Sequence, residues 1–471
     1  MKNNVYYDDS LRLFTQAILQ FFDKDFLLKN LFLRDASGKL TFILKDSNYS
    51  IVKLKKLKPL VEDKLKSYIE PGFSICESQE LYDDEIEGLV LNEKTERRLE
   101  FDGEIVIIHY YERRIIGGDW QRFYSESNGP ARLVFASVKG GVGRSTALCV
   151  CASALARAGK RVLTIDLDLE APGLGNMLLT NETLPAFGLL DYFVESNLNN
   201  INEEFLVDMV GSSWLSFGKG RIDVIPAIGK KSLTNPGNVI AKISRAYLPG
   251  LDSDGNISTF MDNLRSLLNS IDPGRYDAVL IDSRAGLHET TASALVGLGA
   301  EIFCFGVNQP QTFSGYELLF SSMRNDSPIL SSDANWLDKL NFIHAKAPAD
   351  ENKRRLFNEK IEAVISKSFS IGARQIPELV NIDDLKDSFE VEWNEDVGDE
   401  VVNEIVLDGK EIISENKEVI PIFNDERYIE FNPLSDKDSL NETVYNSTFE
   451  TLIKRVFLIV EESLSKNYEL G

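Results

Sequence analysis

The residues best suited to chemistry in this chain form a glycine-rich stretch from Lys139 to Thr146, with the sequence KGGVGRST. An apolar run, 133–136, precedes the stretch, and a segment of helical character, 147–158, follows it. A glycine-rich turn between a strand and a helix lets successive backbone N–H groups point at one anion, and the helix dipole favours negative charge there. The stretch therefore predicts a site for the phosphates of a nucleoside triphosphate.

One residue of the stretch departs from the general phosphate-loop pattern, because Arg144 stands where that pattern has a lysine. Lysine is a compact point charge, whereas arginine is a planar fork that can contact β- and γ-phosphate oxygens with two parallel hydrogen bonds. Two interpretations remain open at this point. Arg144 supports hydrolysis, or it binds the nucleotide without turnover.

The elements around the stretch alternate between strand-like and helix-like segments. Several strand-like segments are near-continuous apolar runs, which is typical of parallel strands buried on both faces. The expected strands are 132–138, 161–166, 221–226, 276–282, 301–307 and 340–345. The pattern predicts an α/β domain with a mostly parallel sheet and helices on both faces, and ligands of such sheets bind at the carboxyl ends of the strands.

Three aspartates stand at or near two of these strand ends. Asp282 ends an apolar strand, where a carboxylate can hold Mg²⁺ through water, and the alternative is a turn or helix-capping aspartate. Asp166 and Asp168 are two residues apart, so an extended chain would place both on one face. The alternative for this pair is a structural Asx turn.

Three blocks of the chain, in this order, resemble the deviant Walker A class of ParA/MinD-type P-loop ATPases. They are KGGVGRST at 139–146, VLTIDLDLEAPG at 162–173 and YDAVLIDSRAG at 276–286. The resemblance covers residues 131–350, and faintly 420–465. The combination KGGVGR, DLDLEAPGLG and DSRAG also resembles a subgroup in which arginine at this position is usual. Many of its members are suspected of roles in bacterial conflict or signalling.

The resemblance implies a role for each matching position. It implies nucleotide contacts from Lys139, Gly140, Gly141, Val142, Gly143, Arg144, Ser145, Thr146 and Gly286. It implies Mg²⁺ ligation or support by Ser145, Asp166 and Asp282. The implied catalytic residues are Lys139, Arg144 and Asp168. Lys139 would reach across a dimer to the partner's nucleotide, and Asp168 would orient the attacking water.

Two further positions near the site leave alternatives open. Arg284 could stabilise transition-state charge, or it could pair with Asp282 or Glu170 as part of the structure. The segment 346–348 sits where the family reads adenine, although the family's usual asparagine is missing. ATP is therefore expected over GTP by resemblance alone.

The composition narrows the classes of partner. With 51 basic and 74 acidic residues the net charge is −23, which argues against direct DNA binding. A lysine-rich stretch, 53–58, is expected to be a solvated helix face. The chain lacks an apolar run of membrane-spanning length and a signal-peptide pattern, and its four cysteines form no CxxC pair. We expect a cytoplasmic protein with buried cysteines, and a C-terminal helix that packs on the sheet rather than on a membrane.

The domain prediction divides the chain into four parts. Residues 1–125 form an α+β domain of unknown role, with a helix over 11–22, strands at 40–44 and 104–108, and an acidic loop at 83–87. The nucleotide-binding domain spans 131–375. An acidic insertion spans 376–420, with a hairpin around Asp408 and Gly409, and 421–471 pack back on the nucleotide domain.

The function expected from these features is a slowly hydrolysing ATPase that binds Mg²⁺ and forms a nucleotide-dependent homodimer. It would regulate or position an unknown protein partner, engaged through 1–125 or the acidic insertion. The alternative is a non-catalytic nucleotide-binding scaffold.

Overall fold

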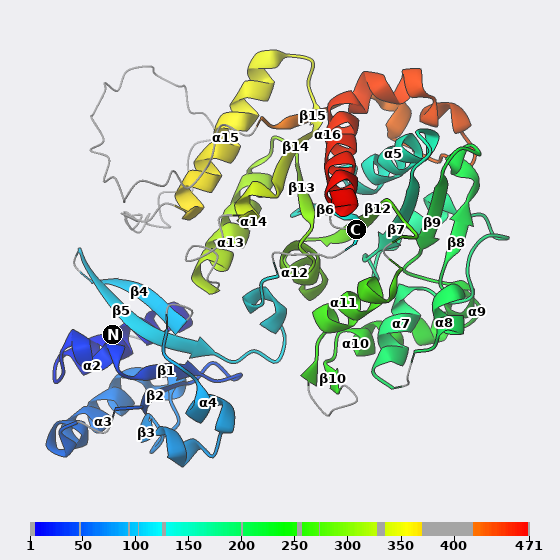
Figure 1. Ribbon diagram of the computed structural model, residues 1–471. Helices are drawn as coiled ribbons and strands as arrows, with labels where there is room; N and C mark the ends of the chain where they lie inside the picture. Colours follow the sequence, from blue (N-terminus) through cyan, green and yellow to red (C-terminus); the bar gives the residue numbers. More distant parts are fainter. Residues whose placement is uncertain are drawn as a thin grey trace.

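The computed structural model describes residues 5–46, 49–92, 95–101, 103–124, 129–198, 201–251, 257–272, 274–326, 335–369 and 418–469. A small sheet is built from the N-terminal part of the chain and a large sheet from the rest (Figure 1). The predicted fold class, an α/β domain with a mostly parallel sheet preceded by a smaller α+β region, is confirmed. The acidic insertion lies outside the described residues up to position 417, as does its predicted hairpin.

The large sheet has eight strands in the order β15-β14-β13-β6-β12-β7-β9-β8. Its strands are β6 Ala131–Ser137, β7 Arg161–Asp166, β8 Gly211–Ser213, β9 Arg221–Ile225, β12 Ala278–Ala285, β13 Glu301–Gly306, β14 Leu340–Ala347 and β15 Ile420–Phe423. All neighbours are parallel except β8, which runs antiparallel to β9 at one edge. The six predicted strands are confirmed, whereas the two short edge strands β8 and β15 were not predicted.

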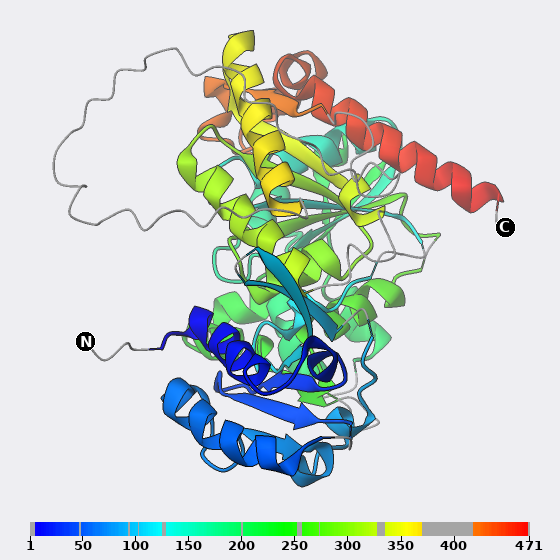
Figure 2. The same cartoon turned by 90° about the vertical axis from the view of Figure 1, so that its left-hand side faces the viewer.

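Helices cover both faces of the large sheet, so its central strands are apolar on both sides (Figure 2). Along β6, Val134 and Ala136 join one core, while Leu133 and Phe135 join the other, as the alternation of side chains along a strand requires. The first core includes α7 Leu189–Ser196, α11 Phe260–Ser270, α12 Glu289–Val296, α13 Pro310–Asp326 and α15 Glu351–Phe369. The second includes α5 Arg144–Arg157, α6 Leu174–Leu178 and α16 Glu442–Glu469.

The C-terminal helix α16 packs against the sheet, as predicted. Phe449, Leu452, Val456 and Val460 are buried in the second core. None of the helices in the described part of the chain combines the length and apolarity that a bilayer crossing requires. All four cysteines are free and buried, also as predicted.

Short elements complete the large domain at the periphery of the sheet. They are α8 Glu203–Val207, α9 Lys230–Thr234, α10 Val239–Ala246, the hairpin strands β10 Gly250–Leu251 and β11 Ile257–Ser258, and α14 Asn335–Asp338.

The small sheet has the strand order β3-β2-β1-β5-β4. Its strands are β1 Leu31–Arg34, β2 Leu40–Leu44, β3 Ile75–Glu77, β4 Glu96–Phe101 and β5 Glu104–Glu112. The helices of this part of the chain are α1 Tyr7–Leu19, α2 Lys24–Leu28, α3 Ile51–Leu65 and α4 Asp84–Gly88. The lysine-rich stretch lies on α3, where Leu54 and Leu57 are buried while Lys53 and Lys55 face solvent. The predicted solvated helix face is therefore confirmed.

The prediction of a loop over Asp83–Glu87 is wrong, because this stretch forms the start of α4. The Asp83 carboxylate caps the helix by accepting a hydrogen bond of 3.2 Å from the Ile86 backbone N–H. Acidic residues in a first helical turn also interact favourably with the helix dipole. Ile86 is buried and anchors this turn against the small sheet.

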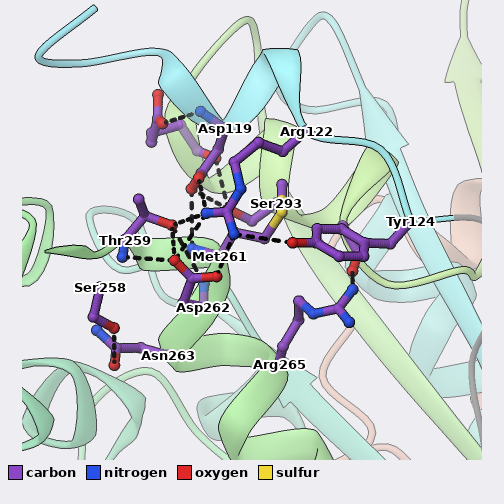
Figure 3. Close-up of polar contacts among 12 residues, drawn as sticks. Asp119, Arg122, Tyr124, Ser258, Thr259, Met261, Asp262, Asn263, Arg265 and Ser293 are labelled. Carbon is purple, nitrogen blue, oxygen red and sulfur yellow. Dashed lines mark hydrogen bonds and ion pairs between the residues drawn. The ribbon is translucent and has the colours of Figure 1, made fainter. Parts of the chain in front are cut away.

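The segment between the two sheets is docked on α11 and α12 (Figure 3). Arg122 makes two hydrogen bonds, of 2.8 and 2.7 Å, to the Asp262 carboxylate at the start of α11. Asp119, which is fully buried, accepts hydrogen bonds from the Met261 N–H at 2.9 Å and from the Ser293 hydroxyl of α12 at 3.2 Å. The connection between the sheets is thus held by polar contacts, of which those of Asp119 are buried and the Arg122–Asp262 pair is partly exposed.

Candidate nucleotide-binding site

The glycine-rich stretch forms an open turn between β6 and α5. Gly141 and Gly143 have φ angles of +73° and +91°, in the left-handed region that glycine adopts without strain. Gly143 is the N-cap of α5, and no side chain caps the helix there. The first N–H groups of α5, which lack partners within the helix, are therefore available to an anion at this end.

The strand ends beside this turn bring the predicted metal ligands together. In the sheet β12 lies between β6 and β7, and Asp282 of β12 is directly opposite Asp166 of β7. The Ser145 hydroxyl donates a hydrogen bond to Oδ2 of Asp282. Oδ1 of Asp282 is buried and has no hydrogen-bond partner among the described residues.

This donor set fits a magnesium ion. Burial raises the pKa of both Asp166 and Asp282, and the nearby charge of Asp282 raises the pKa of Asp166 further. A divalent cation would offset the cost of keeping these two carboxylates charged, and Mg²⁺ takes one or two carboxylates together with waters and phosphate oxygens. In the described residues no group of three or more His, Cys, Asp or Glu side chains is arranged to hold a metal by itself.

Asp166 and Asp168 do not continue as one extended strand, since β7 ends at Asp166. The Asp168 N–H donates to Oδ1 of Asp166 at 3.1 Å, which is the Asx turn that stood as the alternative. Oδ2 of Asp166 accepts from the N–H groups of Gly173 and Leu174, at 3.2 and 3.1 Å. Asp166 thereby connects the loop after β7 to the end of that strand.

Arg144 lies inside the domain rather than over the turn, and its side chain is only 8% exposed. It donates a hydrogen bond to the Ser283 carbonyl, and its guanidinium lies 3.8 Å from the Asp168 carboxylate. The arginine therefore links the loop after β7 to β12.

Lys139 and Gly286 each have a partner within the chain. The Lys139 ammonium donates to Oε1 of Gln309, which lies just before α13. The Gly286 N–H donates to the Ser137 carbonyl at 2.9 Å, and Gly286 has a φ angle of +92°. The single Gly286 N–H would have to leave this carbonyl before it could contact a phosphate, whereas the Lys139 ammonium has further N–H donors.

Arg284 pairs with Glu170, one of the two structural partners considered for it. The guanidinium donates to Oε1 of Glu170, which lies in the loop after β7. This ion pair is a second link between the loop after β7 and the last residues of β12.

Two contacts at the site were not predicted. Gln309 holds Lys139, and Lys346 donates from its ammonium to the Gly141 carbonyl at 3.1 Å. The partners of these bonds are 170 and 205 positions apart, so no local pattern could have indicated either contact.

Comparison with known proteins gives one family match and a set of similar folds. Residues 133–390, more than half of the chain, match the model of the CobQ/CobB/MinD/ParA nucleotide binding domain. No curated protein matches the chain.

Three of the solved structures that match the chain have the following identities, coverages and TM-scores. A ParA family ATPase from Chlorobium tepidum TLS is 17% identical, with 69% of this chain and 98% of that chain covered and a TM-score of 0.41. The septum site-determining protein MinD from Pyrococcus horikoshii OT3, complexed with Mg-ADP, is 18% identical, with 47% and 72% covered and a TM-score of 0.31. The pNOB8 ParA bound to nonspecific DNA is 18% identical, with 50% and 74% covered and a TM-score of 0.31.

The family match includes β6 from residue 133 onward, the glycine-rich turn, α5, and the strands β7 and β12 that carry Asp166 and Asp282. This chain therefore belongs to the CobQ/CobB/MinD/ParA nucleotide binding domain family.

Proposed function

We propose that this protein binds Mg·ATP at 139–146 and hydrolyses it slowly. The observation that carries the proposal is the hydrogen bond from Ser145 to Asp282, whose other carboxylate oxygen is buried without a partner among the described residues. A hydroxyl and a carboxylate in this arrangement, at the end of a glycine-rich turn, suit Mg²⁺ bound together with a nucleotide. The ion would offset charge on the β- and γ-phosphate oxygens.

In this proposal the N–H groups from Gly141 to Thr146 hold the β-phosphate. Asp168 orients the attacking water, and it lies 14% exposed beside Arg144. Turnover requires the Arg144 guanidinium to separate from Asp168, so that the carboxylate can accept a proton of the water and the arginine can reach phosphate oxygens. The mobile part of the cycle would be the loop 167–173, which Asp166 anchors.

We further propose that the nucleotide acts as a dimerisation switch. Lys139 is half-buried, and among the described residues its ammonium donates to a neutral amide, that of Gln309, so exchange for a phosphate in a second subunit would be favourable. A γ-phosphate contacted by both subunits gives the difference in affinity between open and closed states that a switch requires. Residues 1–125 or the acidic insertion, 376–420, would engage a protein partner in the cytoplasm, in bacterial defence or signalling.

The second candidate function is a non-catalytic nucleotide-binding scaffold, and the buried position of Arg144 favours it. If Arg144 stays on the Ser283 carbonyl when the nucleotide binds, the phosphates lack the cation that usually stabilises transfer. Such a protein would bind ATP and would release little phosphate.

Molar mass by light scattering, with and without Mg·ATP, measured together with phosphate release, distinguishes these functions. We expect a nucleotide-linked dimer, slow phosphate release, and a persistent dimer for Asp168→Ala, because the water is no longer oriented. Asp63→Ala, at an exposed position on α3, is the control and should match the wild type. Binding without phosphate release would favour the scaffold, and Arg144→Lys would then be tested for restored turnover. An unchanged mass, even for Asp168→Ala, would contradict the switch.

A further inference from the structure

We infer that Lys346 is a positioning residue that braces the phosphate loop from its carbonyl side. The inference rests on the proposed function, since it concerns how the loop 139–146 is kept ready for a nucleotide. The role of Lys346 differs from that of Arg144, which lies at the start of α5.

The backbone at Lys346 is unusual for a lysine. The pairing of β14 with β15 shifts between His344 and Ala347, so the chain bulges at the intervening residues. Lys346 has a φ angle of +54°, in the left-handed region that residues with a Cβ atom rarely adopt. Bulges beside functional sites commonly redirect a side chain, and a strained backbone in such a place points to a function.

The bulge directs the Lys346 side chain to the phosphate loop. Its ammonium donates a hydrogen bond of 3.1 Å to the carbonyl of Gly141, the first of the two loop glycines with positive φ. In a loop whose N–H groups converge on an anion, the carbonyl groups point outward. Lys346 therefore contacts the loop on the side opposite to the phosphates and can hold its curvature.

The segment that carries Lys346 is itself well anchored. The Asn424 N–H donates to the Ala347 carbonyl at 3.0 Å, which restores the pairing with β15 after the bulge. Arg354 of α15 donates to the carbonyls of Pro348 and Ala349, at 2.9 and 2.6 Å. The lysine thus reaches the loop from a fixed support.

The position of Arg144 makes such a brace useful. Its guanidinium is engaged on the other side of the loop, with the Ser283 carbonyl and near Asp168. Lys346 supplies an exposed positive charge next to the loop backbone, which also raises the local potential for an anion. Both effects act on the part of the loop that ATP and ADP share.

The test is the binding of fluorescent ATP and ADP analogues, with Mg²⁺, to the full chain. For Lys346→Met we expect about tenfold weaker binding of both nucleotides, the size of one charged hydrogen bond, with an unchanged ratio between them. Lys346→Arg should recover most of the affinity, because it can still donate to the carbonyl. Lys353→Met, at an exposed lysine of α15, is the matched control and should bind like the wild type.

Lys346→Asn separates the brace from the backbone conformation, because asparagine tolerates the left-handed region but is too short to reach Gly141. It should bind as weakly as Lys346→Met. Wild-type affinity in Lys346→Met, or a loss confined to ATP, would overturn the inference while the proposed function stands. A wild-type chain that binds neither nucleotide would overturn the proposed function and the inference together.

Discussion

Ser145 and Arg144 are neighbours at the start of α5, yet they face different parts of the site. The Ser145 hydroxyl contacts Asp282 within β12, whereas the Arg144 guanidinium extends to the Ser283 carbonyl and toward Asp168. The first contact belongs to the metal site proposed above. The second connects β12 to the loop after β7.

Replacing Ser145 tests the metal site at the scale of one hydroxyl. Ser145→Ala removes the partner of Asp282 Oδ2, so we expect the gain in nucleotide affinity on adding Mg²⁺ to fall by about tenfold or more. Titration of a fluorescent ATP analogue in Mg²⁺ and in EDTA measures this gain. Binding in EDTA should change little.

A second serine of α5 serves as the control for this prediction. Ser153 is buried in the same helix and donates to the Leu215 carbonyl, away from the strand ends that carry the aspartates. Ser153→Ala should keep the full magnesium effect. If Ser145→Ala also keeps it, the Ser145–Asp282 pair is not part of a metal site.

At the scale of elements, β14 carries a buried histidine between the sheet and α15. The His344 ring stacks on Phe357 with a centroid distance of 4.0 Å, and Nδ1 has no hydrogen-bond partner among the described residues. Burial, together with the nearby positive charge of Arg354, lowers the pKa of His344 to about 4. The neutral ring is therefore the form that fits this packing.

Because its pKa is lowered, His344 should make the protein less stable in mild acid. The pKa of His344 is lower in the folded state than in the unfolded state, so its contribution is fully present above about pH 6.5 and is lost as the pH falls toward 4. At pH 5 the loss should be about 2 kcal/mol relative to neutral pH. Urea unfolding of the wild type and of His344→Phe, at pH 7.5 and pH 5, measures the difference.

In His344→Phe the decrease in the free energy of unfolding between pH 7.5 and pH 5 should be smaller than in the wild type by that amount, whatever the variant's stability at pH 7.5. A drop equal to that of the wild type would mean that His344 does not remain neutral in the folded protein at pH 5.

At the scale of the whole molecule, the docked segment sets how the two sheets are connected. The Tyr124 N–H donates to the Val296 carbonyl of α12, and the Arg265 guanidinium of α11 lies 3.4 Å from the centroid of the Tyr124 ring. The helix α12 begins at Glu289, three positions after Gly286. The segment that leads from the small sheet is thus attached to α12, the helix that follows Gly286.

Arg122 contributes to this attachment, and a substitution can remove its side chain. Its pair with Asp262 is partly exposed, so Arg122→Ala should cost the docked state only about 1 kcal/mol and speed proteolytic cleavage between the sheets about fivefold. Limited proteolysis with mass spectrometry gives the rate and the site of cleavage.

The control for this variant is Arg427→Ala, which breaks an exposed ion pair with Asp425 before α16. It should leave cleavage between the sheets unchanged. Equal cleavage rates for Arg122→Ala and the wild type would show that Arg122 does not hold the segment in place.

Much of the large sheet was predictable because its strands are long apolar runs buried on both faces. The edge strands β8 and β15 have only three and four residues, which is too short for a periodic pattern to be distinguished from a loop. The helix α4 was missed because acidic composition was interpreted as a loop. There, one capping carboxylate and one buried isoleucine decide the conformation.

By itself, the sequence determined that a glycine-rich turn would follow a buried strand and that aspartates would stand at or near the ends of two apolar strands, because glycine conformations and apolar runs are local properties. The sheet order, which places β7 beside β12 and Asp166 opposite Asp282, came from the tertiary structure. Only the tertiary structure decided which partners the arginine and lysine side chains at the site contact. Arg144 to Ser283, Arg284 to Glu170, Lys139 to Gln309 and Lys346 to Gly141 are each more than 100 positions apart. Such flexible side chains have many possible acceptors, and the packing of the sheet selects which acceptor lies within reach.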